Sequence, residues 1–186
     1  MRNRKPRVLL DVDGVLADFL TPAYALLNHL GRTNHRPEDQ TEWHMFDRFD
    51  KAHEPAFIRA CGEKGWCRNI PTYAGAKEGY RALALADRAD VYIVTAPMPT
   101  AHWANERDEW LHEHFGIPRS RIVHTSAKFL VAGDVLIDDK PDNIASWAEH
   151  HPKGLPLLWH QPYNASAQVG HRTRSWAEVM AHIEGL

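Results

Sequence analysis

Short runs of apolar residues recur along the chain, and each run ends at polar or small residues. Continuous runs that are rich in β-branched side chains are typical of strands buried on both faces of a sheet. The first three runs end directly before Asp11, Thr95 and Asp138. The sequence predicts strands at residues 8–10, 91–94, 135–137 and 155–159.

Between these runs, apolar residues recur at the spacing of an amphipathic helix, as Trp103 and Trp110 do. Two helix starts also have local markers. Pro141 suits the first turn of a helix, and Ser175 with Glu178 has the spacing of a capping box. Helices are expected at residues 18–30, 76–85 and 103–115, and from Pro141 and Ser175 onward.

The order of these elements predicts the fold class. Strands that alternate with helices form a parallel sheet with helices on both of its faces. Residues 32–75 break the alternation, because they combine many charges and scattered aromatic residues with no convincing strand. We expect an α/β fold with a core domain of residues 1–17 and 76–186 and a small helical cap of residues 18–75, inserted after the first strand. Such a cap would cover the carboxyl ends of the strands, where open α/β sheets bind ligands.

Composition and charge narrow the classes of function. The 186 residues suit one domain or a core with a modest insertion, and the net charge is -2. The chain has no basic block of the kind that binds a nucleic-acid polymer through its phosphates. No stretch approaches the ~18 apolar residues of a membrane span, and Asp11, Asp13 and Asp18 interrupt an N-terminal run that would otherwise resemble a secretory signal. We expect a soluble, cytoplasmic protein with neither a polymer nor a membrane as partner.

Acidic residues follow two of the predicted strands. Asp11 and Asp13 end the first strand, and Asp138 and Asp139 follow residues 135–137. Parallel strands place their carboxyl ends at one edge of a sheet, so these carboxylates should converge. A single Asp at a strand end is more often a turn former or a helix N-cap, but two such clusters at one edge would repel each other without a cation. Mg²⁺ binds carboxylate oxygens together with water and phosphate, which makes all four residues candidate ligands.

Two further residues have the chemistry of a phosphate site. Thr95 follows the second predicted strand, so its hydroxyl and the next amides, beginning with Ala96, can donate to phosphate oxygens. Lys128 lies ten residues before Asp138, and its ammonium could neutralise both a phosphate and a nearby carboxylate. Each residue alone has an ordinary interpretation, as a strand former or as a solvated surface charge. Their shared edge with the carboxylates is what favours phosphate binding.

In type and order these residues resemble the four motifs of the haloacid dehalogenase (HAD) superfamily. The first motif is Asp11-Val-Asp13-Gly-Val, the second Thr95, the third Lys128 and the fourth Asp138-Asp139. The second aspartate of the first motif separates the phosphatases of this superfamily from its metal-free dehalogenases. The resemblance therefore implies a HAD-like phosphatase.

Within the superfamily the chain is similar to the 5'(3')-deoxyribonucleotidases. The resemblance covers nearly the whole chain but is weak in the insertion, and Ala96 stands where a serine is expected. The resemblance implies a small nucleoside monophosphate as substrate, Asp11 as the nucleophile that forms an aspartyl-phosphate, and Asp13 as general acid and base. It also implies Mg²⁺ held by Asp11, by the backbone carbonyl of Asp13 and by Asp138 or Asp139, the choice between the last two staying open. The similar stretches are residues 11–19, 110–116, 134–139 and 175–176.

The insertion offers aromatic residues that could stack on a nucleobase. Trp43, Phe46 and Trp66 are the candidates, and a small hydrophobic core under the cap is an equally good interpretation of each. Two other functions stay open. A phosphatase for another small phosphorylated metabolite would use the same four motifs, and a non-catalytic phosphate-binding module could keep the same fold without needing all of them. The oligomeric state also stays open, with a homodimer among the alternatives.

Overall fold

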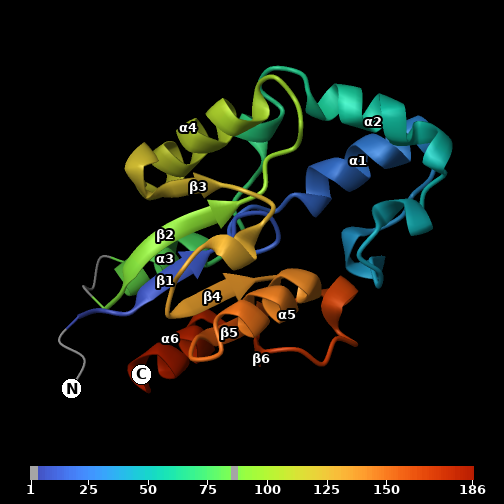
Figure 1. The fold of residues 1–186 in the computed structure, drawn as a ribbon. Coiled ribbons are helices and arrows are strands. Elements are labelled where there is room, and N and C mark those ends of the chain that lie inside the picture. The colour runs from blue at the N-terminus through green and yellow to red at the C-terminus, as the bar shows by residue number, and fades with distance from the viewer. Residues whose placement is uncertain (1–3, 85–87) are drawn as a thin grey trace.

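The computed structural model describes residues 4–84 and 88–186. Its centre is a six-stranded sheet with the order β3-β2-β1-β4-β5-β6, in which every neighbouring pair is parallel (Figure 1). The predicted α/β class with a parallel sheet is confirmed. The strands are β1 (Arg7–Leu10), β2 (Asp90–Thr95), β3 (Ile122–His124), β4 (Val135–Asp138), β5 (Leu155–Trp159) and β6 (His171–Thr173).

Helices cover both faces of the sheet. The predicted helical segments are confirmed, although the first begins at Leu20 and the predicted end of the second, Leu85, lies outside the described residues. Pro141 occupies the first turn of its helix, as expected. The α-helices are α1 (Leu20–Gly31), α2 (Glu54–Cys61), α3 (Ala76–Ala84), α4 (Trp103–Phe115), α5 (Pro141–His150) and α6 (Trp176–Glu184).

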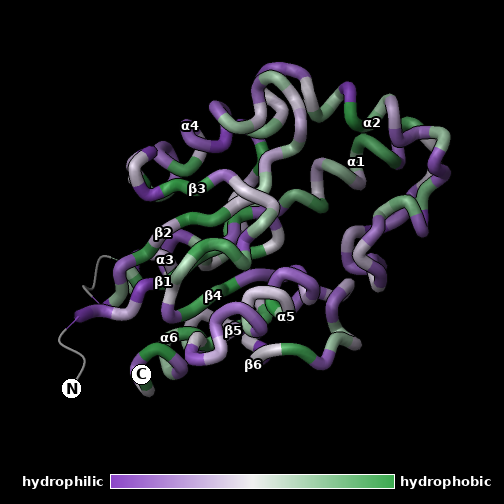
Figure 2. The backbone as a smooth tube through the Cα atoms, viewed as in Figure 1, coloured by the Kyte–Doolittle hydropathy of each residue, from purple (hydrophilic) through white to green (hydrophobic). Residues whose placement is uncertain are grey.

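The alternation of side chains along the strands divides the interior into two layers. Leu9 and Leu136 face one side and pack with Trp147 of α5. Val8 and Leu10 face the other side, where α3, α4 and α6 supply the facing apolar residues. In Figure 2 the strands β2 and β4 are hydrophobic, whereas the segment after α1 is largely hydrophilic. The sheet is therefore buried on both faces, which explains why its central strands are continuous apolar runs.

The capping box predicted for α6 forms only in part. Ser175 accepts a hydrogen bond from the backbone N–H of Glu178 at 3.2 Å, as a capping residue should. The Glu178 carboxylate, however, accepts from the backbone N–H of Arg174 at 2.7 Å and not from that of Ser175. The helix start is correct, and the reciprocal bond is displaced by one residue.

Residues 32–75 contain α2 and several short 3-10 turns, and the structure, which describes this whole stretch, gives it no strand. Its buried residues Phe49, Phe57 and Cys67 join the same apolar cluster as α4 and the sheet. An isolated bridge between Ala17 and Thr72 closes the ends of the excursion. The assignment of 18–75 as a cap domain with exact bounds stays a prediction.

Among the described residues, no helix combines the length and the apolar character needed to cross a membrane. The 3-10 turns of the chain are Pro37–Asp39, Met45–Asp47, Lys51–His53, Cys67–Asn69, Arg119–Arg121, Lys128–Leu130 and Pro162–Asn164.

Candidate active site

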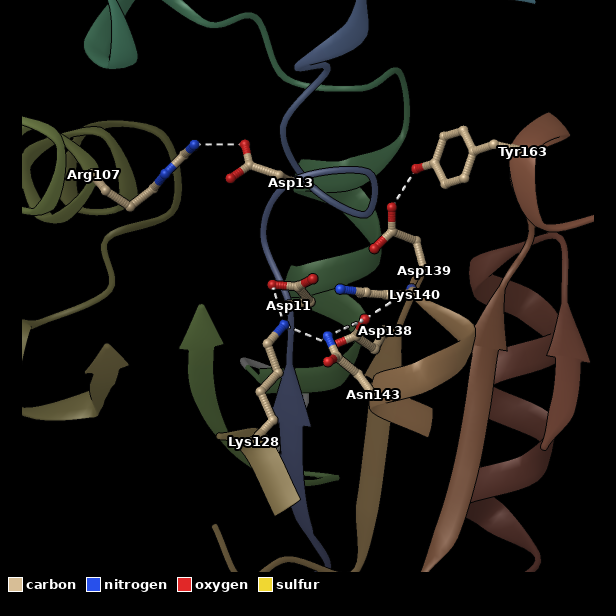
Figure 3. A network of polar contacts seen from close by, with 9 residues as sticks. All are labelled: Asp11, Asp13, Arg107, Lys128, Asp138, Asp139, Lys140, Asn143 and Tyr163. Atoms are coloured by element: carbon tan, nitrogen blue, oxygen red, sulfur yellow. Dashed lines mark hydrogen bonds and ion pairs between the residues drawn. The ribbon is translucent and has the colours of Figure 1, made fainter. Parts of the chain in front are cut away.

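The carboxyl ends of β1 and β4 lie side by side, because Leu10 pairs with Ile137. The residues that follow these strands therefore meet, as the strand-end pattern predicted. Side-chain oxygens of Asp11, Asp138 and Asp139 all lie within 4.8 Å of one another, and all three residues are buried (Figure 3). This carboxylate cluster, as we call these three residues, sits where the strand order reverses, the usual ligand position in open α/β sheets.

The Lys128 ammonium pairs with two members of the carboxylate cluster. Its Nζ lies 2.7 Å from Asp11 Oδ1 and 2.6 Å from Asp138 Oδ2, and the side chain is only 2% exposed. Burial lowers the pKa of this ammonium, but the two carboxylates outweigh burial, and the net pKa is raised. Lys128 is therefore charged, and it holds Asp11 and Asp138 in fixed positions.

One ammonium does not balance three buried carboxylates. Burial and the neighbouring charge of Asp138 raise the pKa of Asp11 to about 7, although Lys128 acts in the opposite direction. Burial, Asp11 and Asp138 also raise the pKa of Asp139 well above its ordinary value, with Tyr163 and Lys128 opposing the shift. Both pKa values are therefore raised by burial first and by repulsion among the carboxylates second, and Lys128 offsets these effects only in part. Because all its donors are carboxylate oxygens, the cluster suits a hard divalent cation.

The two aspartates of the fourth motif have different surroundings. Asp138 is fully buried and, besides Lys128, accepts hydrogen bonds from the backbone N–H of Lys140 at 2.8 Å and from Asn143 Nδ2 at 3.1 Å. Asp139 Oδ2 accepts a short hydrogen bond from the Tyr163 hydroxyl. Asp139 lines the pocket above the cluster, whereas Asp138 is not among the residues that line it. Asp139 thus presents its carboxylate to a ligand more freely than Asp138 does.

Gly14 allows this close packing. It adopts a φ of 79°, and a Cβ at this position would overlap the Asp139 carboxylate and the Tyr163 hydroxyl. Its carbonyl accepts a hydrogen bond of 2.6 Å from Gln161 Nε2. The loop after β1 is therefore pressed against the segment that follows β5, and a larger residue than glycine has no room.

A pocket of about 570 Å³ opens above the cluster. The predicted phosphate-binding residues Thr95, Ala96 and Lys128 line its floor together with Asp11 and Asp139. Asp13 also lines the pocket, but its carboxylate is turned away from the cluster toward α4, where it pairs with Arg107 (Figure 3). The structure thus brings together the predicted residues of all four motifs, with the Asp13 side chain outside the carboxylate cluster.

Two of the three aromatic candidates of the insertion line the pocket, and the third does not. Trp43 and Phe46 line the pocket, and Trp43 is 40% exposed. Trp66 does not line the pocket; its ring stacks on Trp103 with centroids 5.6 Å apart and meets Phe19 edge-on. Trp66 therefore packs in the interior, which is the alternative that the sequence left open for it.

Several pocket residues were missed by the sequence interpretation. Lys140 was the easiest to find, since it directly follows Asp139. Figure 3 shows its ammonium directed toward Asp11, and its Nζ lies 5.0 Å from the centre of the Trp43 ring. Tyr163 has no local marker and belongs to a stretch that reads as a loop. The missed lining residues include Phe19, Met98, Trp103, Lys140, Asn143 and Tyr163.

Comparison with known proteins agrees with this geometry. Residues 5–185 match the family described as 5' nucleotidase, deoxy (pyrimidine), cytosolic type C protein. The chain belongs to the 5'(3')-deoxyribonucleotidase family. The resemblance inferred from the sequence is thereby confirmed, and the match includes the insertion, where the resemblance was weak.

The alignments with relatives of the family cover most of this chain and most of each relative. The mitochondrial 5'(3')-deoxyribonucleotidase of Mus musculus is 29% identical over 95% of this chain and 84% of its own length. A Bordetella parapertussis protein provisionally named a 5'(3')-deoxyribonucleotidase is 33% identical over 94% of this chain and 95% of its own. The 5'(3')-deoxyribonucleotidase of Bacillus subtilis is 24% identical over 94% of this chain and 96% of its own length.

Solved structures confirm the HAD-like fold. A HAD family hydrolase from Deinococcus radiodurans R1, crystallised with phosphate and sodium, superposes with a TM-score of 0.65 at 18% identity, over 97% of this chain and 96% of that chain. A haloacid dehalogenase-like family protein from Streptococcus pneumoniae gives a TM-score of 0.61 at 13% identity, over 96% and 98%. At such identities the likeness concerns the fold alone.

Proposed function

We propose that this member of the family is a Mg²⁺-dependent phosphatase that hydrolyses deoxynucleoside monophosphates through an aspartyl-phosphate. One observation carries the proposal: a cluster of three buried carboxylates with a buried lysine lies at a pocket that is lined by Asp11, Asp139 and Lys128 of this cluster and by aromatic side chains. A charge-deficient carboxylate cluster suits a cation, and the cation with Lys128 suits a phosphate dianion. The aromatic walls suit a planar base.

Asp11 and Asp139 would hold the metal directly, because both line the pocket. Asp138, whose oxygens accept from Lys128, Lys140 and Asn143, would act mainly by orienting Lys128. When bound, Mg²⁺ would neutralise the charge that spreads over the phosphate oxygens during transfer. The distribution of hydrogen bonds supports this division between the two aspartates of the fourth motif.

Each residue of the site has a separate role in the proposed reaction. Lys128 binds one oxygen of Asp11 and leaves the other to attack phosphorus, so the P–O bond to the nucleoside breaks as the acyl phosphate forms. Asp13, at the pocket wall, gives its proton to the departing oxygen and then takes a proton from the water that hydrolyses the acyl phosphate. Thr95 and Ala96 lie at the floor of the pocket, where the hydroxyl and the amide suit phosphate oxygens.

A panel of phosphomonoesters tests the function. With Mg²⁺, we expect kcat/KM for deoxynucleoside monophosphates to exceed that for sugar phosphates by at least tenfold, because only the former present a base to the aromatic walls. Without Mg²⁺ all rates should fall to background. Asp47, Lys51 and Glu54 also line the pocket, and their charges favour the second candidate, a phosphatase for another polar metabolite. A clear preference for sugar phosphates would support that candidate and contradict the first.

Trp43 tests the contact with the base. Replacing Trp43 with alanine should raise KM for deoxynucleoside monophosphates by about 5- to 150-fold, since stacking on a base is worth about 1–3 kcal/mol, and should leave para-nitrophenyl phosphate kinetics almost unchanged. Ile58→Ala is the matched control, because Ile58 is also 40% exposed and does not line the pocket. Equal losses on both substrates in the Trp43 variant would count against stacking.

The remaining expectations from sequence stay predictions. These are the cytoplasmic location, the absence of a polymer or membrane partner, and the homodimer. The substrate panel does not depend on any of them.

A further inference from the structure

Arg107 is a fully buried charge with few partners. Its side chain, on α4, is 0% exposed, and its Nη2 donates to Asp13 Oδ1 at 2.5 Å. Among the described residues, its Nε and Nη1 find no hydrogen-bond acceptor. The guanidinium lies 5.5 Å from the ring centre of Trp103 and 5.2 Å from that of Trp110. A guanidinium has five N–H donors, so this one is buried with most of its hydrogen-bonding capacity unused.

Such an arrangement contributes little to stability. A buried ion pair often stabilises a fold no more than apolar side chains of similar volume, because desolvation offsets the attraction. Unpaired buried donors add a further cost. Asp13 is 29% exposed and would stay hydrated without its partner. A methionine between Trp103 and Trp110 would keep the packing of the guanidinium stem and remove these costs.

The backbone around Arg107 is held firmly. The buried Glu106 accepts hydrogen bonds from the backbone N–H groups of Gly65 and Arg68, and Trp110 Nε1 donates to the carbonyl of Ile70 at 2.7 Å. These contacts fasten α4 to the end of the insertion. The guanidinium therefore has a fixed position, from which it can fix the carboxylate that it binds.

The Asp13 carboxylate is turned toward α4 and away from the carboxylate cluster (Figure 3). With Oδ1 bound to Arg107, only Oδ2 remains for a group in the pocket. We infer that Arg107 is a positioning residue: it keeps Asp13 out of the carboxylate cluster and aims its second oxygen at the leaving group. This inference rests on the proposed role of Asp13 in proton transfer. Without the guanidinium, Asp13 would rotate freely and would compete for the cation.

Leaving-group dependence tests the inference. In Arg107→Met, kcat for a deoxynucleoside 5'-monophosphate should fall about 10- to 100-fold, a part of the ~10²–10⁴-fold that a general acid contributes. The burst of para-nitrophenol from para-nitrophenyl phosphate should keep its rate, because that leaving group departs without a proton. The melting temperature should stay within about 5 °C of the wild type. Arg107→Lys, which retains the charge, should recover part of the loss.

Arg119→Met is the control, because Arg119 pairs with Asp108 at 2.6 Å and its side chain is 72% exposed. It should change none of these rates. Equal losses of both rates in Arg107→Met, or no loss of either, would overturn the inference. If the methionine variant does not fold, the same comparison on Arg107→Lys decides, with a selective loss on the nucleotide expected. A wild-type protein that hydrolyses neither substrate would instead contradict the proposed function.

Discussion

Replacing Asp11 with asparagine is expected to reduce turnover of every phosphomonoester on the order of 10⁴-fold or more, as removal of a nucleophile does in other covalent mechanisms. The amide keeps the shape of the side chain but cannot attack phosphorus. Steady-state rates and acid-quench trapping of radiolabelled phosphoenzyme measure the effect, and no label should be trapped in the variant. Near-normal rates with several monoesters would show that Asp11 is not the nucleophile.

The same variant should fold well, which separates loss of chemistry from loss of structure. The pKa of Asp11 is about 7 in the folded protein, against about 3.9 for an unperturbed Asp. Because the folded value is the higher one, the contribution of this group to stability is greatest at low pH and is lost as the pH rises from about 4 to 7. Asp11→Asn should therefore melt at a higher temperature than the metal-free wild type at pH 8, and not at pH 4. Asp142→Asn, a change of an exposed residue in the first turn of α5, is the control; it should leave the rate unchanged and should not raise the melting temperature at pH 8, because an acidic side chain there stabilises the helix N-terminus.

Removing divalent cations is expected to abolish turnover, and adding Mg²⁺ should restore it. Bound Mg²⁺ should also stabilise the fold, by about 2.7 kcal/mol at a concentration 100 times its Kd, because it relieves the repulsion among Asp11, Asp138 and Asp139. Thermal melting with and without Mg²⁺, after treatment with EDTA, measures both effects. If EDTA left turnover intact, the role of the carboxylate cluster as a cation site would be wrong.

The two aspartates of the fourth motif provide a matched pair for this experiment. Asp139→Asn should weaken Mg²⁺ binding by at least about tenfold, because Asp139 lines the pocket and even the loss of a hydrogen-bond partner of a metal ligand typically costs about 10- to 100-fold. Asp138→Asn should retain more of the Mg²⁺ affinity and lose kcat, since Asp138 positions Lys128. Calorimetric titration of the two variants distinguishes these outcomes. The opposite ranking of affinities would assign the direct contact to Asp138.

Much of the fold was accessible from local patterns. Residues 8–10 and 135–137 are apolar runs because β1 and β4 are covered on both faces, so their burial is visible in the sequence. The strands β3 and β6 were missed. Both are three residues long, lie at the sheet edges and include His or Arg side chains. An edge strand has a neighbouring strand on one side only, and both of these strands are partly exposed. Neither strand therefore has a long apolar run that would reveal it in the sequence.

Some residues of the candidate site could likewise be placed from the sequence, and others could not. Asp11, Thr95 and Asp138 could be placed together because each ends a parallel strand, and all such strands end at one edge. Trp43 and Trp66 could not be distinguished, because both are isolated aromatics in a polar segment. Arg107 resembles any solvated charge on a helix, yet it is fully buried against Trp103 and Trp110.

The sequence by itself determined the α/β class, the central strands and the order of the four motifs, because these depend on periodicity and on residue types close together in the chain. Only the tertiary structure decided which charges are buried and which partners they have. Lys128 meets Asp11, and Arg107 meets Asp13, across separations of more than 90 residues. Burial and pairing of this kind depend on how distant segments pack, and no local pattern of a single chain encodes that packing visibly.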